Sequence, residues 1–259
     1  MLRFSANLGF LWSQLPLLER IERAAANRFA AVELHWPYDT SAAEVHDACQ
    51  RLGLRLLAAN SPIGNIALGE SGLAALPGRE AEFKRSFESS LAWCKEAGAQ
   101  AIHVLPGIVS PEQRASATEI LVSNLQWAAD LAAQHQFTIL LEAINQRDKP
   151  GYFYSTQAES NAIREKCARD NIKLMFDVYH VGVAEGDILK KLEHYLPHIG
   201  HIQIAAVPTR AEPDEGEVAY SVVLNRIETL GYQGWVGCEY KPRAGVEEGL
   251  AWRTPYMTG

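Results

Sequence analysis

The sequence predicts a single (β/α)8 barrel domain that spans residues 1–259. The length of 259 residues is close to the roughly 250 typical of one such barrel. Strand patterns and helix patterns alternate from the first residues to nearly the last, without a linker or a low-complexity tract. The phosphate-binding motifs GxGxxG and GxxxxGK[ST] are absent, which disfavours the alternative of an open nucleotide-binding sheet.

Eight short apolar runs are expected to form the strands. Runs this short, rich in Ile, Leu and Val, are typical of strands buried on both faces of a parallel sheet. They are Leu2–Leu8, Ala31–Leu34, Leu54–Ala59, Ala101–Leu105, Phe137–Glu142, Ile172–Asp177, Ile199–Gln203 and Gly234–Glu239.

A helix pattern follows each predicted strand. The second of these helices is expected to begin with Ser41 as its N-cap and Glu44 as the partner in a capping box. The segment 60–77 after the third strand is a long loop, and such loops within a compact domain are usually functional or disordered. The predicted helices are Leu15–Asn27, Ser41–Leu52, Glu80–Ala97, Pro111–His135, Ser155–Ala168, Asp187–Tyr195, Tyr220–Leu230 and Val246–Trp252.

Composition restricts the class of partner. The chain is 47% hydrophobic and 21% charged, with a net charge of −7, which is ordinary for a soluble globular protein. No basic patch is evident, so neither nucleic acid nor an anionic membrane is an expected partner. Cys49, Cys94, Cys167 and Cys238 are widely spaced, as in reduced cysteines of a cytoplasmic protein. A homo-oligomer is compatible with these features.

Four consecutive predicted strands end in a carboxylate or an amide. Glu142, Asp177, Gln203 and Glu239 follow one another at intervals of 35, 26 and 36 residues, about one strand and one helix each. Barrel enzymes have their active sites at the C-terminal ends of the strands. Carboxylates gathered there repel one another unless a cation lies between them, and oxygen ligands suit Mg²⁺ or Mn²⁺. The alternative for any single acid is a helix cap or an arginine partner.

Cationic side chains on the adjoining loops are candidates for substrate binding. His180 and Lys241 follow the strands of Asp177 and Glu239, and Arg210 lies after the strand of Gln203. Arg210 and Lys241 could bind a substrate carboxylate; the alternatives are a structural His and solvated loop charges. Glu33 and His103 are weaker polar candidates. Aromatic residues expected to wall the pocket are Phe10, Trp12, Trp36 and Tyr38.

Seven segments spread over nearly the whole chain carry a family resemblance. They are Leu2-Arg-Phe-Ser-Ala-Asn-Leu8, Pro37-Tyr-Asp39, Leu76-Pro-Gly-Arg-Glu80, Leu141-Glu-Ala-Ile-Asn145, Phe176-Asp-Val-Tyr-His180, Gly200-His-Ile-Gln-Ile-Ala205 and Trp235-Val-Gly-Cys-Glu-Tyr-Lys-Pro242. Together they resemble the hydroxypyruvate isomerase family, one of the xylose-isomerase-like TIM barrels, which also include the ketose 3-epimerases. The last segment is the most specific.

The resemblance implies one divalent metal ion, Mg²⁺ or Mn²⁺, held by Glu142, Asp177, Gln203 and Glu239. It also implies that Glu142 and Glu239 form the catalytic acid/base pair. Relatives that act on sugars typically have His at the position of Gln203, so the amide favours the hydroxypyruvate and 2-oxo-tetronate isomerases. Three substrate-loop segments depart from the family pattern: Ile204-Ala-Ala-Val-Pro208, Ala211, and Ser61-Pro-Ile-Gly-Asn65.

The expected activity is that of an intramolecular oxidoreductase on a small anionic sugar acid. The leading reaction is hydroxypyruvate to tartronate semialdehyde through an enediolate. A 2-oxo-tetronate isomerase or a ketose 3-epimerase on the same metal site is the first alternative. A metal-dependent phosphodiesterase and a non-catalytic sugar-acid binding protein are the others.

Overall fold

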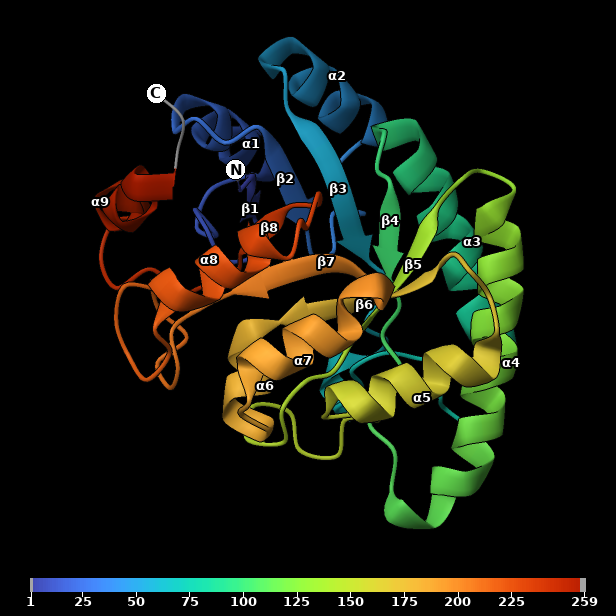
Figure 1. Ribbon diagram of the computed structural model, residues 1–259. Coiled ribbons are helices and arrows are strands. Elements are labelled where there is room, and N and C mark those ends of the chain that lie inside the picture. Colours follow the sequence, from blue (N-terminus) through green and yellow to red (C-terminus); the bar gives the residue numbers. More distant parts are fainter. Residues whose placement is uncertain (1, 257–259) are drawn as a thin grey trace.

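The computed structural model describes residues 2–256 and contains a closed barrel of eight parallel strands in chain order (Figure 1). β8 pairs with β1 and closes the sheet, so the predicted (β/α)8 fold class is confirmed. The prediction of one domain over residues 1–259 includes Met1 and residues 257–259, which lie outside the described range. The strands are β1 Phe4–Asn7, β2 Ala31–Leu34, β3 Arg55–Asn60, β4 Ala101–His103, β5 Thr138–Glu142, β6 Ile172–Asp177, β7 Ile199–Ile204 and β8 Val236–Cys238.

Helices surround the barrel on its outer face (Figure 1), and each predicted helix has a counterpart with slightly different bounds. Three short 3₁₀ segments, Ile66–Leu68, Pro111–Gln113 and Leu196–His198, lie in the connections, and a fourth, Leu250–Tyr256, follows the last helix. The α-helices are α1 Leu17–Ala26, α2 Ala42–Leu52, α3 Glu80–Ala97, α4 Arg114–Ala133, α5 Gln157–Cys167, α6 Val178–Ala184, α7 Ile188–Tyr195, α8 Tyr220–Thr229 and α9 Val246–Gly249.

One helix was not predicted, and it changes the position of a candidate residue. α6 begins directly after β6, so His180 lies in its first turn and not on a loop. The sequence of α6 contains three valines and a glycine, which are poor helix formers. The Asp177 side chain, however, accepts a hydrogen bond from the Tyr179 amide at 2.9 Å and caps the helix. The strand-end acid therefore starts this helix where propensity alone does not.

The capping box was assigned to the wrong helix. At α2 the Ser41 hydroxyl accepts from the Glu44 amide at 3.4 Å, which is only one half of the predicted box. A complete box occurs at α5, where the Thr156 side chain accepts from the Glu159 amide and the Glu159 carboxylate accepts from the Thr156 amide. Both helices are nevertheless capped at their N-termini, as such side chains favour.

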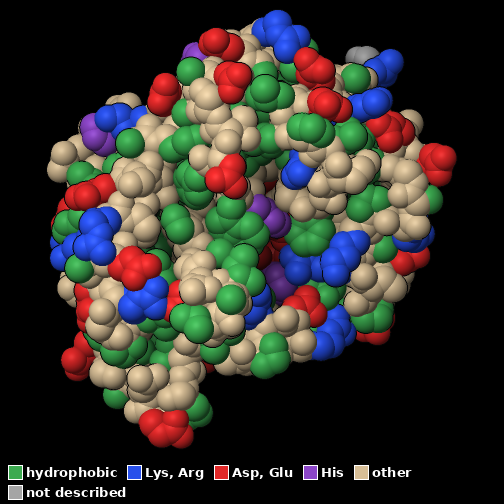
Figure 2. Space-filling view, turned by 180° about the vertical axis from the view of Figure 1, so that it is seen from behind, with side chains coloured by type: hydrophobic (Ala, Val, Ile, Leu, Met, Phe, Trp, Pro, Cys, Tyr) green, Lys and Arg blue, Asp and Glu red, His purple; other side chains and the backbone are tan. Residues whose placement is uncertain are grey.

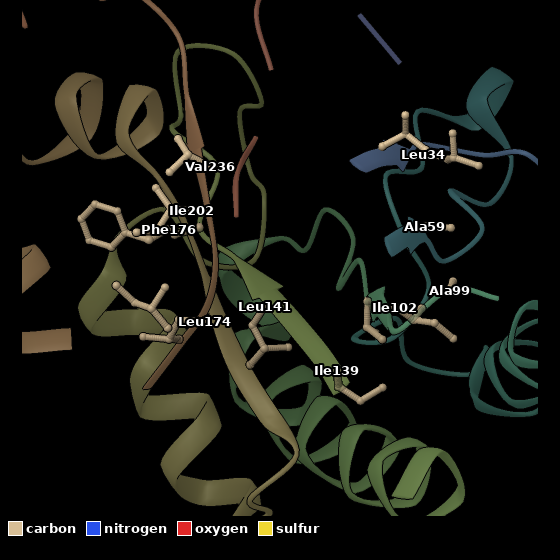
Figure 3. Packing of buried hydrophobic residues seen from close by; sticks show 14 of the residues in the cluster. Leu34, Ala59, Ala99, Ile102, Ile139, Leu141, Leu174, Phe176, Ile202 and Val236 are labelled. Carbon is tan, nitrogen blue, oxygen red and sulfur yellow. The ribbon is translucent and has the colours of Figure 1, made fainter. Parts of the chain in front are cut away.

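The strands alternate between an outer apolar face and an interior that becomes polar at one end. Residues such as Leu141, Leu174 and Ile202 belong to the large core cluster of strands and helices (Figure 3). Their neighbours along the strands point the opposite way. Ala58, Ala101, Leu140 and Met175 form a separate, small apolar cluster, which we interpret as filling the barrel interior below the C-terminal strand ends. Two residues further along the same strands, the interior positions are polar: Asn60, His103, Glu142 and Asp177.

The four predicted reduced cysteines are all free and buried. Across residues 2–256, none of the helices combines the length and the apolar character needed to cross a membrane.

Candidate active site

A ring of polar side chains lines the C-terminal end of the barrel, one from each strand or the residue directly after it. Close contacts link its members: the Asn7 amide lies 3.0 Å from a Glu239 oxygen, and His103 Nδ1 lies 3.5 Å from Glu142 Oε2. All but Asn60 are buried. The eight are Asn7, Glu33, Asn60, His103, Glu142, Asp177, Gln203 and Glu239. The structure thus places the four sequence-predicted strand-end residues at the same end of the barrel.

A cavity of about 640 Å³ opens above this ring. Figure 2 shows a hollow with histidine side chains deep inside and Lys and Arg side chains around it. Phe10 and Trp36 line the cavity, as predicted. Trp12 and Tyr38 do not: Trp12 is buried and donates to Glu247 at 2.9 Å, and Tyr38 donates to the Asn60 carbonyl at 2.6 Å. The predicted wall was therefore half correct.

Glu142, Asp177 and His180 form a buried cluster of potential metal ligands. One ligand atom from each lies within 4.8 Å of the others. Burial, followed by the charges of Glu239 and Asp177, raises the pKa of Glu142 well above its usual value. Burial and then Glu239 raise the pKa of Asp177 to about 8. Without a cation, these carboxyl groups are therefore inclined to hold protons.

His180 is oriented by the loop after β5. Its Nδ1 accepts a hydrogen bond from the Asn145 backbone amide at 3.3 Å, so the ring proton resides on Nε2. That nitrogen lies 3.6 Å from both Glu142 Oε1 and Asp177 Oδ2. Burial, and then the charge of Arg210, lower the pKa of His180 to about 3, so the ring is neutral. In this tautomer Nε2 is a donor directed into the site and not a metal ligand.

Gln203 lies beside a buried carboxylate. Its amide nitrogen donates to Glu33 Oε2 at 2.7 Å, and Glu33 also faces His201 Nε2, which is 3.1 Å from both carboxylate oxygens. Burial opposes ionisation of Glu33, but the charge and hydrogen bond of His201 outweigh it and lower the Glu33 pKa. Gln203 Oε1 has no hydrogen-bond partner among the described residues.

Glu239 is held by three donors. Asn7 and His35 lie 3.0 and 3.1 Å from its Oε1, and Arg210 donates to Oε2 at 2.8 Å. Burial alone would raise the pKa of Glu239, but the His35 hydrogen bond and the Arg210 charge lower it to about 2. Glu239 is therefore ionised, in contrast to Glu142.

Of the two loop cations, only Arg210 reaches the polar ring. Its guanidinium lies 4.8 Å from the centre of the Phe10 ring and 4.9 Å from that of Tyr179. Its Nη2 is 3.9 Å from Asp177 Oδ2. Lys241 lines the cavity but is exposed, and its backbone amide donates to the Arg210 carbonyl at 2.8 Å. Arg210 therefore lies over the carboxylates and Lys241 at the rim.

The sequence interpretation missed several residues that support the site. Asn7, His35 and Asn60 lie at the ends of β1, β2 and β3, so the strand-end rule applied to Glu142 could have found them. Asn145 and Asp148 carried no comparable signal, because they lie in an irregular loop. The Asp148 carboxylate accepts a hydrogen bond from the Tyr179 hydroxyl at 2.8 Å and lies 3.5 Å from Arg210 Nη1.

The chain is similar to known isomerases over nearly its full length. The family model described as xylose isomerase-like TIM barrel matches residues 21–256. The chain is 43% identical to a 2-oxo-tetronate isomerase from Cupriavidus necator over 98% of each protein. It is 37% identical to the hydroxypyruvate isomerase of Escherichia coli K12, over 99% of this chain and 100% of that one. A crystal structure described as AP endonuclease, family 2, from Brucella melitensis matches with a TM-score of 0.96 at 38% identity, with 100% of both chains covered.

Proposed function

The chain belongs to the xylose isomerase-like TIM barrel family and is an isomerase of that family, and on that premise we propose that it is a metal-dependent aldose–ketose isomerase of a small 2-oxo-3-hydroxy acid. The observation that carries this proposal is the pair of buried strand-end glutamates in contrasting surroundings: Glu142 faces the acids Asp177 and Glu239, whereas Glu239 is contacted by Asn7, His35 and Arg210. Two such groups in one pocket are suited to an acid role and a base role.

The proposed cofactor is a divalent metal ion, Mg²⁺ or Mn²⁺. Three buried oxygens, Glu142 Oε1, Asp177 Oδ2 and Gln203 Oε1, have no hydrogen-bond partner within residues 2–256. Leaving such atoms without a partner is costly, whereas a hard cation would satisfy them. Glu142, Asp177 and Gln203 would hold the ion, and Glu239 would join them on release of one of its contacts to Asn7, His35 and Arg210. When bound, the ion would act as a Lewis acid on the substrate carbonyl.

The proton transfer is assigned to the two glutamates. Glu239, which Asn7, His35 and Arg210 keep ionised, removes the proton from the hydroxyl-bearing carbon. Glu142, at the end of β5, delivers a proton to the adjacent carbon, and the hydroxyl proton passes to the former carbonyl oxygen, which completes the exchange of the two groups. His180 donates its Nε2–H to a substrate oxygen. Acid–base steps of this kind typically contribute ~10²–10⁴-fold.

Arg210 is proposed to bind the substrate carboxylate. Its guanidinium lies close to two aromatic rings, with Nη2 2.8 Å from Glu239 Oε2 and Nη1 3.5 Å from Asp148 Oδ2. A guanidinium can bind a planar carboxylate through two hydrogen bonds. A neutral ketose would lack this contact, which favours an acid substrate over the 3-epimerase alternative.

Hydroxypyruvate is the smallest substrate that fits this chemistry, and a four-carbon 2-oxo acid is the second candidate. The cavity of about 640 Å³ lies in the range of drug-sized pockets, so a three-carbon acid would fill only part of it. The 2-oxo-tetronate isomerase relative supports the longer acid. A phosphodiesterase is disfavoured, because the net charge of −7 opposes binding of a nucleic-acid backbone.

The test is a metal-dependent substrate assay. Chelated protein should be inactive and should regain activity with Mn²⁺ or Mg²⁺ on hydroxypyruvate, on a four-carbon 2-oxo-3-hydroxy acid, or on both. Asp177→Asn should lose metal and activity, whereas Asp130→Asn, an exposed acid paired with Arg169, should keep both. Full turnover by protein shown by elemental analysis to be metal-free would contradict the metal assignment. Turnover of a neutral ketose in preference to both acids would contradict the substrate class.

A further inference from the structure

We propose that Glu33 is a positioning residue that fixes the side-chain amide of Gln203, so that Gln203 Oε1 faces the carboxylates of Glu142 and Asp177. The role of Gln203 Oε1 as a metal ligand rests on the function proposed above. Either end of the Gln203 amide could point into the site. The contact with Glu33 explains why the oxygen, and not the NH₂ group, does so.

The hydrogen bonds of Glu33 determine which way the amide points. The NH₂ of Gln203 donates to Glu33 Oε2 at 2.7 Å, and the Ser5 hydroxyl donates to Glu33 Oε1 at 2.8 Å, so the carboxylate is an acceptor at both oxygens. The carbonyl oxygen of the same amide then points away from Glu33. It is buried and has no hydrogen-bond partner among the described residues. A buried carbonyl oxygen left in this way is suited to a cation.

Glu33 itself is not available as a metal ligand. Its Oε1 accepts from the Ser5 hydroxyl at 2.8 Å and lies 3.1 Å from His201 Nε2. Its Oε2 accepts from Gln203 and is 3.5 Å from the Asn7 amide. Both oxygens are therefore occupied by donors, and only 3% of the residue is exposed. These donors hold the carboxylate in place, which is the arrangement expected of a group that orients a ligand.

The backbone provides space for Glu33 at two positions. The pairing register of β2 and β3 shifts between Val32 and Leu34, and such irregularities re-aim a side chain near active sites. β8, which is separated from β2 only by β1, carries Gly237. A Cβ atom at that glycine would lie 2.2 Å from Glu33 Oε1 and 2.9 Å from His201 Nε2. The absence of a side chain at Gly237 thus admits the Glu33–His201 pair.

The test measures binding of Mn²⁺ alone, from the electron paramagnetic resonance signal of the free ion. Glu33→Met removes the acceptor at similar volume and should weaken Mn²⁺ binding by about ten- to hundred-fold, the range for groups that orient metal ligands. Glu185→Met is the control, because Glu185 is a largely buried carboxylate paired with Lys191 and does not line the cavity. It should bind Mn²⁺ as the wild type does.

A double-mutant cycle separates orientation from simple loss of charge. If Glu33 acts through Gln203, Glu33→Met should change Mn²⁺ affinity by less than about twofold in a Gln203→Ala background, because the ligand is already lost. A penalty that persists there would show that Glu33 acts only through its charge and would overturn the proposal. So would wild-type affinity in folded Glu33→Met. If circular dichroism shows that Glu33→Met does not fold, the cycle is repeated with Glu33→Gln. The loss of Mn²⁺ affinity should then be smaller, and it should again disappear in the Gln203→Ala background.

The two proposals fail separately. A wild-type protein that binds no Mn²⁺ would overturn the metal site and this inference together. A wild type that binds Mn²⁺, with Glu33→Met equal to it, would overturn only the role of Glu33.

Discussion

Replacement of Arg210 by Met tests how the site recognises an acid. The guanidinium donates to Glu239 Oε2 at 2.8 Å and is largely buried, with 16% of the side chain exposed. A charge-assisted hydrogen bond contributes about 1.5–3 kcal/mol, which corresponds to about ten- to hundred-fold in affinity. Arg210→Met should therefore raise KM by that factor for an acid substrate. KM for a neutral ketose, where such turnover is measurable, should change little.

The same substitution should also change the pH dependence of kcat. The Arg210 charge is among the causes that lower the pKa of Glu239 to about 2 against the opposing effect of burial. Its removal raises that pKa, and a base is active only when deprotonated. The acid limb of the kcat profile should therefore move to higher pH in Arg210→Met. This shift separates a role beside Glu239 from a role in substrate binding alone.

The assay is steady-state kinetics of the Mn²⁺-loaded protein from pH 5 to 9 on a three-carbon acid, a four-carbon acid and a neutral ketose. Lys241→Met is the matched comparison, because Lys241 lines the same cavity but is exposed at its rim. An exposed charge is screened by solvent and salt, so its KM effect should be only a few-fold. Equal effects of Arg210→Met on acids and on the ketose, with an unchanged pH profile, would refute the reasoning.

Two further predictions concern the carboxyl groups. Glu142→Gln and Glu239→Gln each keep an oxygen at nearly the same volume, so each should fold normally and lose ~10²–10⁴-fold in kcat; a variant that retains Mn²⁺ and wild-type turnover would exclude its glutamate from proton transfer. Burial and Glu239 raise the pKa of Asp177 to about 8 in the metal-free protein, so the native state keeps a proton that the unfolded state has lost. The Asp177 proton should therefore lower the free energy of unfolding by up to about 1.4 kcal/mol per pH unit between pH 6.5 and 8, above the range where His103 and His180 titrate, and the Glu142 proton acts in the same direction. Chemical denaturation at several pH values should show this slope, with Asp177→Asn reducing it and Mn²⁺ abolishing it.

The barrel could be predicted because its signal repeats. Each strand is a short apolar run, and each connection contains a periodic helix, so errors at single boundaries do not change the topology. Helix α6 could not be predicted in the same way. Its valines and glycine disfavour a helix, and its first turn depends on Asp177, whose side chain is fixed by the barrel. There the tertiary structure, and not local propensity, determines the helix.

The candidate site was predictable to the extent that chain order determines it. Glu142, Asp177, Gln203 and Glu239 end consecutive strands, and a parallel barrel brings such ends together. The contacts that give each residue its chemical character join distant segments. Gln203 and Glu33 are 170 residues apart, and Arg210 and Glu239 are 29 apart. No local pattern reports such pairs, because barrel closure and loop conformation create them.

The unequal surroundings of Glu142 and Glu239 lead to an order for the proposed reaction that residue type alone leaves open. Glu142 faces Asp177 and Glu239, and in the metal-free protein burial and these negative charges raise its pKa and favour its protonated form. Glu239 faces Asn7, His35 and Arg210, all of which can donate to it, and these favour its ionised form. A reaction that begins with proton removal from carbon needs the ionised group first. Since Glu239 is that group, we assign it the first proton transfer and Glu142 the second.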